Sequence, residues 1–201
     1  MPRTKTQFES IKHESKAKIE AAGLKLFIER GLLATSVGDI ATAAGISKGL
    51  LYHYYPSKED LYYALVRHAI DSSSAHMQEI LGLPLSPREK IALIAESMVD
   101  SLSRSNETAQ YFVFMNRFLI TENGAAAAQK LVEAAYIPIT LTEQIIAAGQ
   151  SQGLFRAADP FALALSFWAT VNGLCIHRLI LQDKFVSPPP QALVQMLLPE
   201  A

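Results

Sequence analysis

The sequence predicts an all-helical protein of about nine helices, with a small N-terminal head, residues 1–56, and a larger body, residues 57–201. Three observations support this fold class. Apolar residues recur at helical spacing, and Ser, Asp or Pro stand where helices would begin. No hairpin turn between alternating apolar runs is found along the sequence. Half of the residues are hydrophobic and 18% are charged, so the chain has enough apolar surface to build a core.

The chain is expected to begin with a mobile arm over residues 1–15. Its basic side chains, Arg3, Lys5 and Lys12, could reach the phosphates or the minor groove of a duplex, and a solvated tail is an equal alternative. The first helix is predicted over residues 15–30, because it carries an apolar stripe at helical spacing and a glycine follows it.

Residues 36–61 predict two short helices joined by a tight turn, followed by the start of a third helix. Ser36 can cap the first of them, with an acidic residue three positions on. Gly45 breaks this helix, because a left-handed backbone costs little without a Cβ atom. Ser47 can cap the second helix, which stops before Pro56. Two short helices around a turn with glycine are the signature of a helix-turn-helix.

The second of these short helices has an apolar and a polar face. Leu51 and Tyr55, four residues apart, should pack inward. Polar side chains of this kind reach phosphates and base edges, and a glycine lets a duplex approach closely. The residues expected on this outer face are Lys48, Gly49, Tyr52 and His53. An ordinary helical hairpin that carries these residues by chance is the alternative interpretation.

The segment over residues 35–61 closely resembles the DNA-binding domain of the tetracycline-repressor (TetR) family of bacterial regulators. The matching residues are Thr35-Ser36-Val37, Asp39-Ile40-Ala41, Ala44-Gly45, Ser47-Lys48-Gly49, Leu51-Tyr52, Pro56-Ser57-Lys58-Glu59 and Leu61. The match covers the first third of the chain, and the remainder agrees with the family in length and helical content. The resemblance implies a transcriptional regulator, in the first place a repressor, that binds a palindromic operator as a homodimer. It also implies release from the operator when a small molecule binds the C-terminal domain.

The outer face and the resemblance together predict the residues that contact DNA. They are Thr35, Ser36, Thr42, Ser47, Lys48, Gly49, Leu50, Tyr52, His53, Tyr54 and Lys58. Lys58 lies in the first turn of the following helix, where a phosphate clamp is expected, as in the family. Leu50 departs from the family, which usually has Thr, Ser or Ala there, and it implies an apolar contact such as one with a thymine methyl group. Tyr54 and Tyr55 stand where His and Phe are common.

Six further helices are expected in the body, each delimited by a cap residue, a glycine or a proline. Their predicted bounds are residues 57–81, from 86 onward, 106–123, 125–150 with a kink at Pro138, 159–183 and 191–198. Aromatic, Met and lone polar side chains on their inner faces could together line a mostly apolar pocket for a small-molecule inducer, although any single one of them is more often simply core. The candidates are Met98, Phe112, Met115, Phe118, Tyr136, Trp168, Asn172 and His177.

The predicted helix over residues 159–183 is apolar nearly all round, which a peripheral helix of a monomer could not satisfy. The last helix adds further leucines. A homodimer would bury both helices, and two-fold symmetry is what a helix-turn-helix protein needs to span two half-sites. The candidate interface residues are Phe161, Leu165, Leu179, Leu193 and Leu197. Ligand binding would then alter the spacing of the two heads through the helix that begins at residue 57.

Charge and cysteine content restrict the remaining possibilities. Residues 1–60 hold nine Lys or Arg and seven Asp or Glu, a net charge of +2, while the whole chain has −1. A basic head on an acidic body suits DNA binding mildly. The single cysteine, Cys175, is expected to be a small buried residue in a reducing cytoplasm. No signal region is apparent at the N-terminus, and polar residues interrupt the apolar run over 161–181, so we expect no membrane span.

Neither catalysis nor a cofactor is expected. The five histidines show no metal-ligand spacing, and no Gly-rich phosphate loop, nucleophile elbow or acid pair occurs in the sequence. A dimeric ligand-binding adaptor that has kept the helical head without operator binding is the remaining alternative, and Leu50 is the residue that keeps it open.

Overall fold

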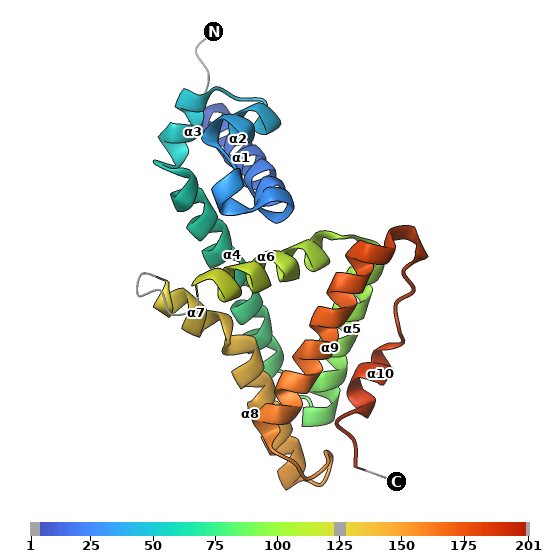
Figure 1. The fold of residues 1–201 in the computed structure, drawn as a ribbon. Helices are drawn as coiled ribbons and strands as arrows, with labels where there is room; N and C mark the ends of the chain where they lie inside the picture. The colour runs from blue at the N-terminus through green and yellow to red at the C-terminus, as the bar shows by residue number, and fades with distance from the viewer. Residues whose placement is uncertain (1–4, 123–127, 200–201) are drawn as a thin grey trace. The chain divides into compact units, whose positions relative to one another are not determined.

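The computed structural model describes residues 5–122 and 128–199, and within these ranges it contains helices and no strand (Figure 1). The all-helical prediction is therefore confirmed. The helices are α1 (Lys5–Ala34), α2 (Val37–Ala44), α3 (Lys48–Tyr54), α4 (Lys58–Gly82), α5 (Pro87–Arg104), α6 (Glu107–Glu122), α7 (Gln129–Ala135), α8 (Ile137–Ser151), α9 (Pro160–Leu181) and α10 (Pro190–Gln195), with a 3-10 turn, η1 (Gln182–Lys184), after α9.

Two compact units divide the chain, Met1–His68 and Ala69–Ala201. The division falls inside α4, because the first turns of this helix pack with the head. Leu61 of α4 is fully buried, and the ring of Tyr62 meets Phe27 of α1 edge-on, with the ring centroids 5.2 Å apart. The head unit thus extends beyond the boundary predicted after residue 56 by about three turns of α4.

The prediction of an N-terminal arm over residues 1–15 is wrong for residues 5–15, since α1 already begins at Lys5. No glycine or proline interrupts residues 5–22, and ion pairs four residues apart support the helix. Lys18 Nζ lies 2.7 Å from Glu14 Oε1, and Lys16 Nζ lies 3.6 Å from Glu20 Oε1. Outside the described part of the structure lie Arg3 and the side chains of Lys5 and Lys12.

A second difference concerns the helix predicted over residues 125–150. It is divided at Tyr136 into α7 and α8, with Pro138 in the first turn of α8. Proline has no N–H group to bond to the preceding turn and fits at a helix start, so the chain begins a new helix there instead of bending one. The predicted helix boundaries at residues 123–125 lie outside the described residues.

The core of the body is built mainly by α5, α8, α9 and α10. From α9, the side chains of Phe167, Val171 and Cys175 are fully buried. Burial raises the pKa of the Cys175 thiol to about 12, because an apolar surrounding disfavours the thiolate, which agrees with its expected structural role. By length and composition alone, Gln129–Ser151 and Pro160–Lys184 could cross a membrane. Core helices of soluble proteins pass the same test, and α9 supplies core residues.

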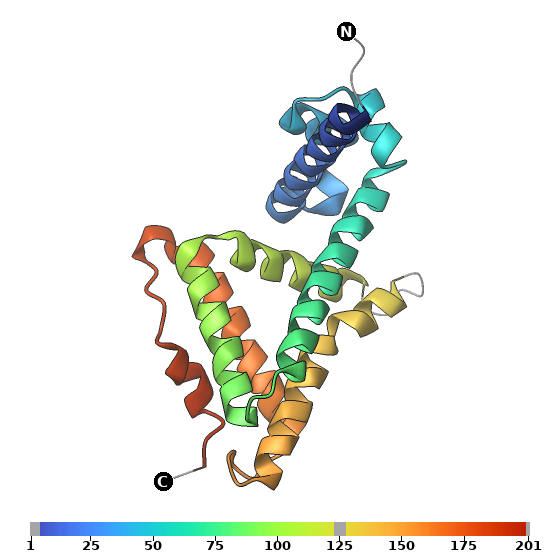
Figure 2. The same cartoon turned by 180° about the vertical axis from the view of Figure 1, so that it is seen from behind.

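Two residues of the predicted dimer interface, Leu193 and Leu197, are buried within their own chain. Leu193 and Leu197 are 1% and 0% exposed, because α10 lies along α5 and closes the core of its own chain (Figure 2). Their side chains are therefore not available to a partner. Leu179 is half-buried against the same core, whereas Phe161 and Leu165 on α9 are 45% and 47% exposed.

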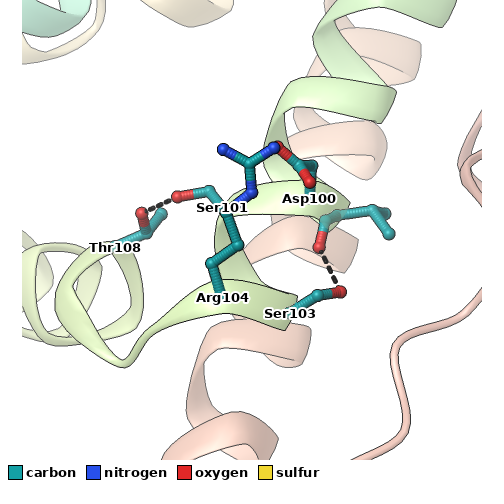
Figure 3. Close-up of polar contacts among 6 residues, drawn as sticks. Asp100, Ser101, Ser103, Arg104 and Thr108 are labelled. Carbon is teal, nitrogen blue, oxygen red and sulfur yellow. Dashed lines mark hydrogen bonds and ion pairs between the residues drawn. The ribbon is translucent and has the colours of Figure 1, made fainter.

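Polar contacts at the end of α5 lie within this helix and between α5 and α6 (Figure 3). The Ser101 and Thr108 hydroxyls share a hydrogen bond between α5 and α6, and Ser103 Oγ donates to Val99 O at 2.8 Å. An exposed ion pair joins Arg104 Nη2 to Asp100 Oδ2 at 2.9 Å. Because such exposed pairs contribute little to stability, the apolar core remains the main support of this corner.

Gly149 of α8 is expected to tolerate no side chain. A Cβ atom at this position would lie 2.2 Å from a ring carbon of the buried Phe155 and 3.2 Å from Pro87 Cβ. We expect Gly149→Ala to lower the free energy of unfolding of the body by about 1–3 kcal/mol, measured by urea unfolding with the fluorescence of the single Trp168 as the probe. In a Phe155→Leu background the same substitution should cost less. An alanine variant as stable as wild type would contradict the predicted clash.

Candidate nucleic-acid interface

Serine caps position the two short helices of the head as predicted. Ser36 caps α2 in a complete capping box: Asp39 N donates to Ser36 Oγ at 3.1 Å, and Ser36 N donates back to Asp39 Oδ2 at 3.0 Å. Gly45 ends α2 with φ 66°, the left-handed conformation that glycine adopts without a steric penalty. Ser47 then caps α3 by accepting a hydrogen bond from Leu50 N at 3.2 Å.

Two contacts hold α3 against the rest of the head. Within α3, all of whose residues are described, Leu51 is the one buried side chain and is fully buried. The residue after the helix, Tyr55, is also buried, and its hydroxyl donates to Glu20 Oε1 of α1 at 2.6 Å. Burial, and secondly the Glu20 carboxylate, raise the pKa of Tyr55, so the phenol stays protonated. The position of α3 is therefore set from its inner face.

Most of the predicted DNA-contacting residues lie on accessible surface. Tyr52 of α3 is 52% exposed, and His53 packs edge-on against the Tyr54 ring at 5.5 Å. Leu50 and Tyr54 are half-buried. The remaining exposed residues of the predicted set are Ser36, Thr42, Ser47, Lys48, Gly49 and His53. The polar face inferred from helical spacing thus exists on the folded head.

An open groove lies beside α3, between the α1–α2 turn and the start of α4. Its lining residues are Leu33, Ala34, Thr35, Ser36, Val37, Gly38, Lys48, Tyr52, Pro56, Ser57, Lys58 and Glu59. The Lys48 side chain reaches from α3 to the first turn of α2. It lies so close to Gly38 that a Cβ atom added to this glycine would be 3.2 Å from Lys48 Nζ. Sequence reasoning missed Gly38 and also Leu33, whose side chain is 95% exposed. Gly38 could have been noticed in the sequence, because it stands two residues after the helix cap Ser36.

Thr35 and Lys58, two further predicted DNA contacts, have polar partners within the head. Thr35 is 1% exposed, and its hydroxyl donates to Gly31 O at 2.7 Å, a carbonyl freed by the kink at Gly31, where φ is 80°. Lys58 Nζ donates to three backbone carbonyl oxygens: those of Leu32 at 2.8 Å, Thr35 at 2.9 Å and Leu33 at 3.4 Å. Its ammonium group therefore binds the segment that joins α1 to α2, while the residue also lines the open groove.

The capping box of α2 gives a pH prediction. Hydrogen bonds from the hydroxyl and then the backbone N–H of Ser36 hold the pKa of Asp39 below its ordinary value. A lowered pKa in the folded state means that the stabilisation is present above the unfolded-state pKa and is lost as the pH falls through the folded-state value. We expect Ser36→Ala to raise the pKa of Asp39 in an NMR titration. Glu89, held in the same way by Ser86 at the start of α5, should not change.

The predicted pocket residues of the body separate into two groups. Trp168 is buried and stacks against Phe112 at 6.1 Å. Its Nε1–H donates to Thr142 Oγ1 at 2.9 Å, and Asn172 Oδ1 accepts from Asn116 Nδ2 at 2.8 Å. Sequence reasoning missed Thr142 and Asn116, because their partners lie on other helices.

The other predicted pocket residues differ in burial. Phe118 is fully buried, and Met98, Phe112 and Met115 are half-buried. Tyr136 and His177 are exposed in the single chain. Tyr136 stands at the junction of α7 and α8, and His177 lies on the outer side of α9 next to the exposed Ile176.

Comparisons with known proteins bear on both units. The sequence pattern of bacterial regulatory proteins of the tetR family matches residues 19–65. The repressor KstR2 of Rhodococcus jostii is 29% identical over 142 residues, which are 71% of this chain and 68% of that protein. KstR2 of Mycolicibacterium smegmatis is 44% identical over 66 residues, 33% of this chain and 32% of that protein, so the chain spans about a third of this relative.

Two solved structures resemble nearly the whole chain. The MbdR regulator from Azoarcus sp. CIB has a TM-score of 0.75 at 23% identity, covering 92% of this chain and 97% of that one. The regulator FadR from Bacillus subtilis, in complex with stearoyl-CoA, has a TM-score of 0.70 at 19% identity, covering 90% and 97%. At these identities the likeness extends the common fold from the head to the body.

Proposed function

Since this chain belongs to the TetR family of bacterial transcriptional regulators, we propose that it is a repressor that binds a palindromic operator as a homodimer. The observation that carries the proposal is the accessible polar face of α3, on a helix fixed from behind by Leu51 and Tyr55. A recognition helix needs this combination, because side chains can read base edges only from a rigid support.

The proposed DNA contacts follow from exposure. Lys48 supplies salt-dependent attraction to a phosphate, and Tyr52 and His53 reach the backbone or base edges. Leu50 supplies an apolar contact, and each mismatched base pair should cost about 1–3 kcal/mol. The remaining contacts are assigned to exposed or partly exposed polar positions of the head: Ser36, Thr42, Ser47, Gly49 and Tyr54.

The proposed homodimer uses the exposed apolar side of α9. Phe161 and Leu165 near its start, and Ile176 and Ile180 near its end, are all more than 40% exposed in the single chain. Burying such a stripe against its symmetry mate would remove apolar surface from water and place two heads for two half-sites. A monomeric mass in solution at micromolar concentration would contradict the dimer.

The proposed inducer is a largely apolar small molecule that binds inside the body. The aromatic pair Phe112 and Trp168, with the amides of Asn116 and Asn172 beside it, offers apolar surface and a few directing polar groups. The acyl-CoA bound to the similarly folded FadR supports an apolar ligand. Binding would lower operator affinity by favouring a conformation in which the heads are differently spaced. We expect the protein in the bacterial cytoplasm, where its operator and inducer would meet.

The experiment that tests the proposed function is selection of bound sequences from a random duplex pool. Wild type is compared with a Tyr52→Ala, Lys48→Ala double variant, in which two exposed side chains of α3 are removed. A palindrome with half-sites about one helical turn or more apart, recovered by wild type only, is the expected result. Recovery of no motif, with only weak salt-sensitive retention, would contradict operator binding.

A further inference from the structure

Glu20 of α1 has two polar partners, and one of them lies at the end of α3. Its Oε1 accepts a hydrogen bond from the Tyr55 hydroxyl at 2.6 Å, although the two residues are 35 positions apart in the chain. The same oxygen lies 3.6 Å from Lys16 Nζ, one turn earlier on α1. Tyr55 is buried, whereas the Glu20 side chain is 35% exposed. The bond therefore joins a buried donor to a carboxylate that keeps its contact with water.

The bond between Tyr55 and Glu20 is the stronger of the two contacts that Glu20 makes. An O–H group that donates to a carboxylate at this distance forms a charge-assisted hydrogen bond, which is about twice as strong as a neutral one. The exposed ion pair with Lys16 contributes little by comparison. A phenylalanine would fill the same space as Tyr55 without making this bond, so the hydroxyl is not needed for packing alone.

The helix α3 depends on this bond because few side chains attach it to the head. Within α3, which is described throughout, Leu51 is the one buried side chain, and it lies at the middle of the helix. Burial of an apolar group is not directional, so this contact alone does not fix the tilt of the helix. Tyr55 ends α3, with its N–H donating to Leu51 O at 2.9 Å, and its hydroxyl ties this end to α1. The outward-facing Tyr52 and His53 lie between the two attachments.

We infer that Glu20 is a positioning residue of the DNA-binding surface, which acts through the Tyr55 hydroxyl to fix the tilt of α3. The inference rests on the proposed operator binding, and it assigns a part in base reading to an acidic residue of α1. Side chains that contact base edges must be held accurately in place, whereas attraction to phosphates is independent of sequence. Loss of the bond should therefore lower the affinity for the operator more than the affinity for unrelated DNA.

The first test measures DNA specificity in Tyr55→Phe, Glu20→Leu and the double variant of the full chain. Fluorescence anisotropy gives the affinity for the duplex selected from the random pool and for an unrelated duplex of equal length. Each single variant should bind the selected duplex about five-fold more weakly and the unrelated duplex as wild type does. The double variant should lose no more than either single one, because both substitutions remove the same bond. Unchanged specificity in the single variants, or additive losses, would overturn the inference.

Two further variants separate the bond from the charge of Glu20. Glu14→Gln is the matched control, because Glu14 also lies on α1 and pairs with a lysine of the same helix, Lys18, at 2.7 Å. It should keep wild-type affinity for both duplexes. Glu20→Gln keeps an oxygen that can accept from Tyr55, so it should retain more specificity than Glu20→Leu. A loss in Glu14→Gln as large as in Glu20→Leu, or a glutamine variant as impaired as the leucine variant, would overturn the inference.

A measurement without DNA distinguishes positioning of α3 from a general loss of stability. Amide hydrogen exchange should become faster over residues 51–55 in Tyr55→Phe and in Glu20→Leu, and should stay as in wild type over residues 24–28 of α1. Equal acceleration in both segments, or unchanged exchange over residues 51–55, would overturn the inference. Tyr55→Phe decides the matter alone if Glu20→Leu fails to fold. If wild type selects no duplex, the proposed operator binding fails, and the exchange still tests the bond.

Discussion

Replacing Leu51 by alanine is expected to abolish operator binding by releasing α3 from the head. Leu51 is fully buried and is the one core side chain that this helix supplies. A helix of seven residues has no stability of its own, because isolated helices shorter than about 12–15 residues are marginal in water. Truncation of a buried leucine costs about 2–5 kcal/mol, much of the stability of a small unit. Circular dichroism during urea unfolding and fluorescence anisotropy with the selected duplex measure the two effects.

Tyr52→Ala is the matched control for this prediction. Tyr52 is the next residue on the same helix, but its side chain is half exposed, so its loss should reduce binding without lowering the stability of the head. Trp168 fluorescence should report an unchanged body in both variants. A Leu51→Ala protein that keeps both wild-type stability and wild-type affinity would show that the inner face of α3 does not fix its position.

Trp168→Ala is expected to cause the largest loss of stability in the body, about 3–5 kcal/mol. The indole is 6% exposed, stacks on Phe112 and meets Phe167 edge-on at 5.6 Å. Its removal leaves a cavity, and it also takes away the donor that Thr142 Oγ1 now accepts from. Urea unfolding followed by circular dichroism measures the loss, since the variant has no tryptophan left to fluoresce.

Trp168→Phe separates the two contributions. A phenylalanine keeps an aromatic ring in the core but cannot donate to Thr142, so the variant should lose the hydrogen bond, worth about 1 kcal/mol, and part of the packing. Trp168→Ala must then be clearly less stable than Trp168→Phe. Equal stabilities would mean that the ring itself contributes little, and that the space it occupies is filled by neighbouring side chains in the variant.

Local signals in the sequence were sufficient for most helix boundaries. Ser36 caps the helix that it was predicted to cap, and Ser86 and Asp159 cap the helices that were predicted to begin at residues 86 and 159, because a side-chain cap bonds to an amide only three residues away. The same local reasoning failed at residues 5–15, which were assigned to an arm although no glycine or proline interrupts a helix there. It also misjudged Pro138, which begins a new helix after Tyr136 where a kink in one continuous helix was predicted.

Roles that depend on distant partners could not be predicted from the sequence. The exposed face of α3 follows from helical periodicity alone, but the carbonyls bound by Lys58 come from a turn more than twenty residues away. Similarly, periodicity shows that Leu193 and Leu197 share an apolar face, and only the packing of α10 on α5 shows that this face is covered within the chain. Whether an apolar helix face packs in the chain's own core or against a partner can be decided only when its tertiary contacts are known.

The packing of α10 on α5 also has a consequence for synthesis on the ribosome. Every side chain that builds the head lies within the first 68 residues, so the head can fold while the rest of the chain is still being translated. The body cannot, because Ile91 and Ile94 of α5 share their core with Leu193 and Leu197, about a hundred residues later. Nascent chains should therefore pass through a stage with a finished head and an open, apolar body, which is when chaperones would be needed most.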